Sequence, residues 1–308
     1  MFLGRKFLSM ENKKKFWTIM IIISCTFWGI SGIFAKFIFN LDRSNTPIFV
    51  SQIRMIISGL VILFFSWLNK DKPMEIWKTK KSSFTIIMFG LLGLIPVQYC
   101  YFEAIKYGDA SIATILQFIG PFFILFYLTI VKRQAPRRIE VICTIIAFIG
   151  VFILATHGNI NHLAITPQVL FWGLLSAIGV ATNTLIPKSL IHEFSPTAVT
   201  GWGLLIAGVG LFIIHPHVSA SILAPQAIVP LLCVLVIGTI IPFQLFTSAL
   251  RYVKATTASM LDAFEPISAT IGSILVFNMH FYLADMIGSV LIILAVILLN
   301  WQPKGKIQ

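Results

Sequence analysis

The chain has 308 residues, of which 57% are hydrophobic and 11% are charged, and its mean hydropathy is +0.92. Soluble domains carry about 25% charged residues, so this composition excludes a water-soluble globule and predicts a polytopic membrane protein. The formal net charge of +12 does not indicate a nucleic-acid partner, because the bases lie in short segments between apolar runs and form neither one face nor one tail.

Ten apolar runs follow one another along the chain. A helix needs about 20 residues to cross the hydrocarbon core of a bilayer, and the runs are close to this length. The first run is too long for the apolar core of a cleaved signal peptide, and no connection is long enough to form a soluble domain. We therefore predict an all-α integral membrane fold with ten transmembrane helices. The runs are 16–39, 46–68, 83–107, 110–131, 137–156, 166–191, 196–214, 227–250, 256–277 and 281–301.

Basic residues are distributed unevenly between alternate connections. With the N-terminus inside, nineteen Lys and Arg residues lie in inside segments, whereas Arg43 alone lies in an outside loop. The positive-inside rule then predicts that both termini are cytoplasmic, and we expect a bacterial cytoplasmic (inner) membrane. We also predict a basic N-terminal tail over 1–15 and a C-terminal tail over 303–308. The inside residues are Arg5, Lys6, Lys13, Lys14, Lys15, Lys70, Lys72, Lys78, Lys80, Lys81, Lys132, Arg133, Arg137, Arg138, Lys188, Arg251, Lys254, Lys304 and Lys306.

The two halves of the chain resemble each other at an offset of 145 residues. "AIKYGDASIATILQFIGP" (104–121) and "ALRYVKATTASMLDAFEP" (249–266) are identical at six of 18 positions. These positions include the pair Tyr107 and Tyr252 and the pair Pro121 and Pro266. The match predicts two five-helix repeats, over residues 16–156 and 163–302.

Five is an odd number of helices, so the second repeat must enter the membrane inverted. Inverted repeats are typical of secondary transporters, which bind substrate near the membrane midplane between the halves. This architecture predicts alternating access to a central site. The alternative is that the repeat is retained for stability alone.

Two acids and a proline interrupt the ninth apolar run. Asp262 and Glu265 are three residues apart and so share a helix face, while Pro266 cannot donate a backbone hydrogen bond. Acids inside a membrane are costly and usually face a partner or a wet cavity. We predict a proton-coupling or cation-recognition site here. In the alternative interpretation, both acids bond to neighbouring helices as structural contacts.

Further polar residues inside the predicted helices are candidates for the same site. Gln117 occupies the place of Asp262 in the first repeat. Gln98 and Gln244 each follow a mid-helix proline by two residues (Pro96 and Pro242). Paired interrupted helices are the best sequence indication of a transporter's site, so Pro96, Pro121, Pro242 and Pro266 are predicted to break helices. The remaining candidates are Trp28 in the first helix, Asn183 and Thr184 in the sixth, and Arg54 in the second, where it could meet an acid or a carboxylate substrate.

Several of these segments resemble the drug/metabolite transporter superfamily in its ten-helix EamA-like branch. "FWGISGIFAK" (27–36) is similar to the family's first helix, and "EAIKYGDASIATIL" (103–116) resembles its third and fourth. "FEPISATIGSILVF" (264–277) and "IGSVLIILAVILLN" (287–300) resemble the last two, and Arg54 stands where the second helix commonly carries Arg. The chain departs from the family at "VKRQAP" (131–136) and "NMHFYL" (278–283), where a Gly-Glu pair is common.

This resemblance implies export or exchange of small metabolites, often amino acids or drug-like compounds. We therefore expect a small-molecule substrate, a lipid environment and protons as a coupling ion. A second hypothesis is efflux of drugs or lipophilic cations, with Glu265 pairing directly with the cation. A third is a membrane scaffold that transports nothing. Direction, stoichiometry and oligomeric state stay open.

The sequence does not indicate an enzyme, a metal site or a cofactor. It contains no P-loop of the kind that ATP-driven pumps use. The four cysteines lack the close spacing of metal ligands, and the six histidines lie at or near loops. We predict no catalytic, metal-ligating or cofactor-binding residues.

Overall fold

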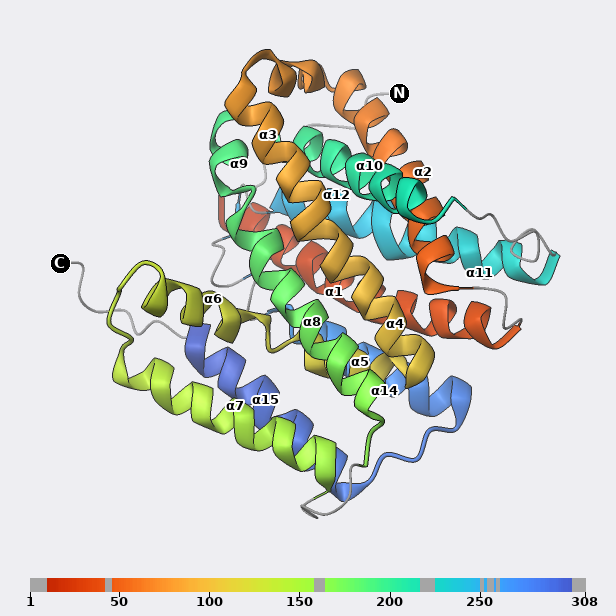
Figure 1. The fold of residues 1–308 in the computed structure, drawn as a ribbon, viewed down its shortest axis with the longest axis vertical. Coiled ribbons are helices and arrows are strands. Elements are labelled where there is room, and N and C mark those ends of the chain that lie inside the picture. The colour runs from red at the N-terminus through yellow and green to blue at the C-terminus, as the bar shows by residue number, and fades with distance from the viewer. Residues whose placement is uncertain are drawn as a thin grey trace.

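A computed structural model describes residues 10–41, 46–157, 164–216, 225–249, 252–253, 258 and 261–300. All regular elements of these residues are helices (Figure 1). The predicted C-terminal tail, 303–308, and residues 1–9 of the predicted N-terminal tail lie outside this part of the chain. Residues 10–15 already belong to the first helix, because Glu and Lys are good helix formers and allow the helix to extend beyond its apolar run.

The helices of the N-terminal half run from residue 10 to residue 156. They are α1 (Met10–Leu41), α2 (Pro47–Leu68), the 3₁₀ turn η1 (Pro73–Lys78), α3 (Lys80–Met88), the π-helical segments η2 (Phe89–Leu94) and η3 (Pro96–Cys100), α4 (Tyr101–Tyr107), α5 (Ala110–Gln117), α6 (Gly120–Ile130) and α7 (Arg138–Thr156).

The described helices of the C-terminal half run from residue 167 to residue 300. Its helices are α8 (Pro167–Leu185), α9 (Lys188–Glu193), α10 (Pro196–Ile214), α11 (Pro225–Leu235), the π-helical segment η5 (Val236–Ile240), α12 (Ile241–Ala249), α14 (Phe264–Phe277) and α15 (Leu283–Asn300).

Eight helices among the described residues are long and apolar enough to cross a membrane. Two further apolar helices, α14 and α15, are shorter. The ninth predicted span is not one unbroken helix, because the chain turns at Asp262 and Ala263 immediately before α14. The structure therefore confirms an all-helical membrane fold, whereas the count of ten spans stays a prediction.

Two pairs of helices pack face to face through glycines. Helix α2 lies against α10, and α7 lies beside α15 (Figure 1). A Cβ atom added to Gly59 would lie 2.7 Å from the Leu205 nitrogen, and one added to Gly150 would lie 2.8 Å from the Gly288 carbonyl oxygen. Small residues at such contacts allow helix backbones to approach closely, which is the usual source of packing energy in a membrane.

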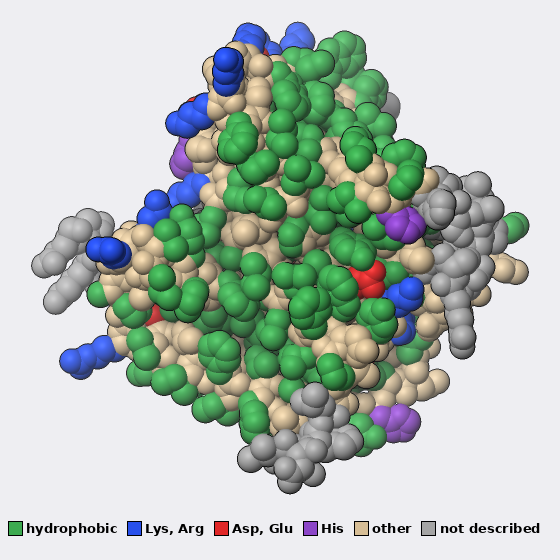
Figure 2. Space-filling model, viewed as in Figure 1, with side chains coloured by type: hydrophobic (Ala, Val, Ile, Leu, Met, Phe, Trp, Pro, Cys, Tyr) green, Lys and Arg blue, Asp and Glu red, His purple; other side chains and the backbone are tan. Residues whose placement is uncertain are grey.

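The two ends of the molecule differ in their number of basic side chains. Figure 2 shows hydrophobic side chains over most of the face in view, while Lys and Arg side chains gather along its upper and left edges. The start of α1, the 69–79 and 131–137 connections and α9 form this basic end (Figures 1 and 2). The opposite end contains the ends of α1, α7 and α10, the 108–109 connection and the start of α15. An apolar surface between two polar ends is the arrangement that a bilayer requires.

Candidate functional site

A cavity of about 490 Å³ lies among the helices of both halves. It extends toward the basic end, where Leu128, Glu140 and Leu299 line it. Its deeper wall carries the polar residues. The polar and aromatic side chains of the lining include Trp28, Ser31, Arg54, Gln98, Tyr101, Thr114, Gln117, Asn183, Thr184, Phe243, Phe246, Asp262 and Glu265.

Two acids reach the cavity, Asp262 from the turn that precedes α14 and Glu265 from the first turn of α14. The chain leaves helical geometry at Asp262, and the Glu265 N–H donates to the Asp262 carbonyl oxygen at 3.0 Å. Pro266 follows and has no N–H to donate, so the turn costs no helical hydrogen bond at that residue. The Cys25 thiol of α1 donates to Asp262 Oδ1 at 3.5 Å. Glu265 therefore has the less restricted carboxyl group of the two, since its carboxylate oxygens appear in none of the hydrogen bonds between described side chains.

Arg54 brings a fixed positive charge from α2 and is only 4% exposed. Its Nε donates to Thr239 Oγ1 at 2.6 Å, and its Nη2 donates to the Gly238 carbonyl oxygen at 2.9 Å. Both acceptors belong to η5, whose wide π turn leaves this carbonyl oxygen available to a side chain. The third nitrogen, Nη1, has no hydrogen-bond partner among the described residues. The cavity thus contains one cation with an unused donor as well as the acid pair.

Amide side chains add neutral polarity. Gln117 of α5 donates its Nε2 to the Val97 carbonyl oxygen at 2.9 Å. Val97 lies in η3, where Pro96 and the π geometry disrupt the usual helical bonding, so this contact satisfies a backbone acceptor inside the membrane. Gln98 of η3 is buried, and Asn183 of α8 lines the same cavity. Amides can bond either charged group of a ligand, because they both donate and accept.

Aromatic rings form the apolar part of the wall. The ring of Trp28 lies 5.3 Å from Phe243 and 5.3 Å from Phe246, centroid to centroid. Tyr101 and Thr114 share a hydrogen bond of 2.8 Å between their hydroxyl oxygens. A site with aromatic walls and a few fixed polar groups has the usual character of a small-molecule pocket.

The structure brings most of the predicted residues together. Asp262, Glu265, Gln98, Gln117, Trp28, Asn183, Thr184, Arg54 and Pro121 all line the cavity. Gln244, in α12, is not among its lining residues, and neither are Pro96, Pro242 and Pro266.

The four prolines act in two ways. The helix is interrupted just before Pro121, at Phe118 and Ile119, and just before Pro266, at Asp262 and Ala263. At Pro96 the helix continues and widens into η3, while Pro242 lies in the first turn of α12, directly after η5. A π turn accommodates a missing N–H without ending the helix, so these two prolines widen helices where breaks were expected.

Sequence reasoning missed several lining residues. Tyr101, Thr114, Ser31 and the two phenylalanines near Trp28 are examples. Tyr101 follows Gln98 by three residues and Thr114 precedes Gln117 by three, so helical spacing could have placed them on the same faces. No such signal distinguishes Phe243 from the many other phenylalanines of the chain.

The end opposite the basic end is closed by polar contacts. The Lys36 ammonium group, near the end of α1, donates to the carbonyl oxygens of Ile105 at 3.1 Å and Lys106 at 3.3 Å and also to that of Gly108. These carbonyls end α4 and have no helical partner, so a cation is the favoured contact. The Ser111 and Thr270 hydroxyl groups bond α5 to α14.

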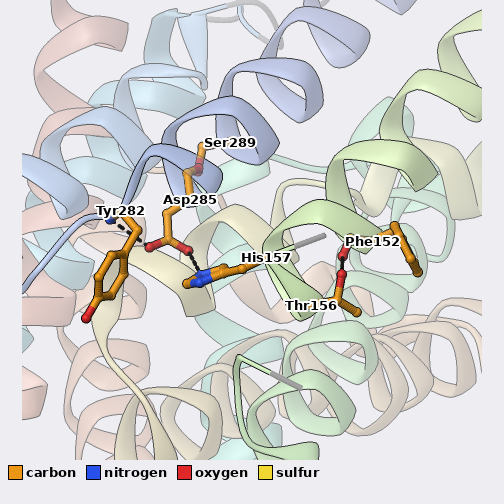
Figure 3. Close-up of polar contacts among 6 residues, drawn as sticks. All are labelled: Phe152, Thr156, His157, Tyr282, Asp285 and Ser289. Carbon is orange, nitrogen blue, oxygen red and sulfur yellow. Dashed lines mark hydrogen bonds and ion pairs between the residues drawn. The ribbon is translucent and has the colours of Figure 1, made fainter. Parts of the chain in front are cut away.

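A further contact at this end joins α7 to α15 (Figure 3). Nε2 of His157, at the end of α7, lies 2.7 Å from Oδ1 of Asp285 in the first turn of α15. The other carboxylate oxygen accepts the Tyr282 N–H at 3.0 Å, which caps α15. Asp285 is 3% exposed. His157 was assigned no role from the sequence, yet its ring holds the ends of two helices together.

Comparison with known proteins identifies the family. The model of the EamA-like transporter family matches residues 15–156 and 168–301. A Salmonella typhimurium protein named as the uncharacterized inner membrane transporter YicL is 30% identical, over 93% of this chain and 95% of its own length. The Bacillus subtilis uncharacterized transporter YwfM is 21% identical, over 96% and 97%. A crystal structure that shares 13% identity superposes with a TM-score of 0.63, over 92% of this chain and 96% of that one, and shows a common fold. The chain belongs to the EamA-like transporter family.

Proposed function

We propose that this protein is a secondary transporter that moves a small zwitterionic metabolite, such as an amino acid, across a bacterial inner membrane. The observation that carries this proposal is the presence of Arg54 and the acids Asp262 and Glu265 in one cavity that also has aromatic and amide walls. A zwitterion presents both charges at once, so it satisfies both kinds of group without leaving either buried and unpaired.

Each part of such a substrate has a matching group. The substrate carboxylate would pair with the positive charge of Arg54, whose buried Nη1 has no hydrogen-bond partner among the described residues. Its ammonium group would contact Glu265, with Asp262 held nearby through Cys25. Trp28, Phe243 and Phe246 would cover an apolar side chain.

Proton coupling follows from competition at one carboxylate. Glu265 can neutralise its charge with a proton or with the substrate's ammonium group, so each occupant displaces the other. A buried acid that exchanges two cations in this way couples their movements across the membrane. The cavity reaches the basic end, which the positive-inside rule assigns to the cytoplasm, so this conformation would be the inward-facing state of the cycle. Export is the direction that the family resemblance implies.

The proposal includes ten spanning helices in two inverted repeats, 16–156 and 163–302, with both termini cytoplasmic. The two separate matches to the family model support this division. The local geometry supports it too. The interruptions before Pro121 and Pro266, and the π-helical segments η2 and η5, recur at an offset of about 145 residues, as duplicated irregularities should.

The deciding experiment measures the flux of labelled amino acids and organic cations in proteoliposomes, with and without a pH gradient. Glu265→Gln should lower gradient-driven flux at least tenfold, because the amide cannot carry a proton. Glu75→Gln is the matched control, since it makes the same change on the exposed 69–79 connection. Flux that is equal in the two variants and indifferent to pH would refute the coupling role.

The aromatic wall favours a second candidate, efflux of lipophilic cations, because aromatic rings bind such cations. Arg54→Gln separates the two. This substitution should abolish the flux of a zwitterion. The flux of a cation should persist or rise, because the buried positive charge of Arg54 no longer repels it. Arg54→Lys, which keeps the charge, controls for folding. If no compound in either panel moves at all, the scaffold hypothesis replaces both.

A further inference from the structure

A second cavity lies outside the site, between α6 and α7. It has a volume of about 340 Å³. Phe126 of α6 and Phe148 of α7 line it and are more than 60% exposed, so it opens on the outer surface of the helix bundle. The full lining is Ile119, Phe122, Phe123, Leu125, Phe126, Thr129, Pro136, Val141, Thr144, Ile145 and Phe148. We call this cavity the α6–α7 groove.

The lining of the α6–α7 groove offers a ligand almost no hydrogen-bond donors or acceptors. Its lining is apolar except for two threonines, and Thr144 already donates its hydroxyl to the Glu140 carbonyl oxygen at 2.7 Å. A polar ligand would lose its hydration here without compensation. Because both helices lie within candidate membrane spans, the apolar molecules that can reach the groove are acyl chains of the bilayer.

Positive charge lies at one end of the groove. Pro136 lines the groove and also belongs to the 131–137 connection at the basic end. Lys132, Arg133 and Arg138 are exposed, and none forms an ion pair with a described residue. Arg137 differs, because its Nε contacts Glu140 Oε1 at 2.7 Å. Three cations without an ion-pair partner among the described residues thus belong to the segment that borders the groove, between the candidate spans that contain α6 and α7.

We propose that the α6–α7 groove binds one anionic phospholipid, with an acyl chain between the helices and the phosphate on Lys132, Arg133 and Arg138. Apolar burial alone would accept any phospholipid, whereas each base near the headgroup contributes about 1 kcal/mol for an anionic one. The basic side chains therefore favour an anionic lipid, and the groove determines where on the protein that lipid binds.

The bound lipid would act on the transport site through α6. This helix lies between the two cavities: Ile124 and Leu128 line the central cavity, Phe122 and Phe126 line the groove, and Leu125 lines both. The helix begins directly after the interruption at Phe118 and Ile119. A lipid behind α6 would restrain its movement about that break, so lipid composition would tune transport.

The test uses native mass spectrometry of the purified full chain, titrated with palmitoyl-oleoyl phosphatidylglycerol or with the matched phosphatidylcholine. Wild-type protein should retain one phosphatidylglycerol at least tenfold more tightly than phosphatidylcholine. The triple variant Lys132→Gln, Arg133→Gln and Arg138→Gln should lose this preference and keep its affinity for phosphatidylcholine. The control Lys78→Gln, Lys80→Gln and Lys81→Gln removes the same charge from the end of η1 and the start of α3, also at the basic end, and should change retention less than threefold.

Two further measurements are informative. Thr144→Phe, which fills the groove, should weaken both lipids. Competition by glycerol phosphate, which has the headgroup chemistry without acyl chains, should require far higher concentrations than the lipid. The proposal is overturned if the control triple variant loses phosphatidylglycerol equally, if wild type retains both lipids alike, or if glycerol phosphate competes as well as the lipid. None of these readouts depends on transport activity, so the proposed function is tested separately.

Discussion

The two ends of the molecule differ in how the helices are joined. At the end opposite the basic end, Lys36 caps α4, Ser111 bonds Thr270, and His157 meets Asp285. The last two contacts connect the N-terminal half to the C-terminal half. At the basic end, α2 and α10 are connected through Asp71 and Ser195, but the central cavity opens beside α6, α7 and α15. Among the described residues, polar contacts therefore join the helices at one end, which we call the closed end, whereas the cavity reaches the other.

This difference indicates how an alternating-access cycle would proceed. Packing between apolar helices in a membrane has no strong hydrophobic driving force, so polar contacts and small residues decide which surfaces stay together. Among the described residues, the polar contacts at the closed end are few, and each of them joins only two elements. If these contacts break while new contacts form at the basic end, the cavity would close at the basic end and open at the other. Each contact can be tested with its own variant.

The largest effect is expected at Lys36. In Lys36→Met, the carbonyl oxygens of Ile105, Lys106 and Gly108 lose their cation, and a charge-assisted hydrogen bond contributes about 1.5–3 kcal/mol. The closed end should open, and flux should fall at least tenfold. The reactivity of Ser31→Cys in a cysteine-free background, measured with an impermeant thiol reagent added at the closed end, should rise.

Lys106→Met is the matched control, because Lys106 lies at the same end and its side chain forms no ion pair with a described residue. Its effect on Ser31→Cys labelling should be small. Equal labelling in the two Lys→Met variants would contradict the role assigned to the Lys36 ammonium group.

The pair His157 and Asp285 should give the second largest effect. Asp285→Asn and His157→Gln should each lower the free energy of unfolding by about 1–3 kcal/mol. His157→Gln removes the ring that contacts the buried Asp285 carboxylate, and Asp285→Asn removes the charge that the ring and the Tyr282 N–H contact. A double-mutant cycle measured by denaturation in detergent should show clear coupling between the two. The same cycle on Arg137 and Glu140, whose ion pair is partly exposed at the basic end, should show less; a larger coupling there would reverse the comparison.

Ser195→Ala tests the contact that joins α2 to α10 at the basic end. The Ser195 hydroxyl donates to Asp71 Oδ2 at 2.9 Å, so its loss should cost about 1 kcal/mol of stability. Flux should stay within threefold of wild type, since this side of the molecule does not line the cavity. A loss of flux as large as that of Lys36→Met would show that the basic end is also a moving contact.

Glu75→Gln should have the smallest effect. Hydrogen bonding and attraction to Lys78 hold the pKa of Glu75 below its usual value, but the side chain lies on the exposed 69–79 connection. Because the pKa of Glu75 is lower in the folded state, its carboxylate stabilises the folded protein at pH values above the unfolded-state pKa of about 4.3. This stabilisation is lost as the pH falls through the folded-state pKa. Solvent screening makes the contribution small. Melting curves of variant and wild type should coincide at pH 7 and at pH 3, and a clear difference at pH 7 would contradict this.

Much of the candidate site could be predicted because polar residues inside a membrane are expensive. Asp262, Glu265 and Arg54 stand out from apolar neighbours for this reason, and all three line one cavity. Gln244 is also a polar residue inside a predicted membrane helix, but it does not line the cavity. Helical periodicity assigns a residue to a face of its own helix, but it does not say which neighbour that face meets.

The sequence by itself determined the all-helical membrane fold, because an apolar run long enough to span a bilayer must bond its backbone internally. It also determined which connections are basic. The tertiary structure alone decided which polar residues share a cavity, that the cavity opens at the basic end, and that Lys36 and His157 hold the other end closed. Lys36 binds backbone carbonyl oxygens, and His157 binds an acid 128 positions away. Every residue carries a carbonyl oxygen, and distant partners meet only through packing, so neither contact leaves a local pattern in the sequence.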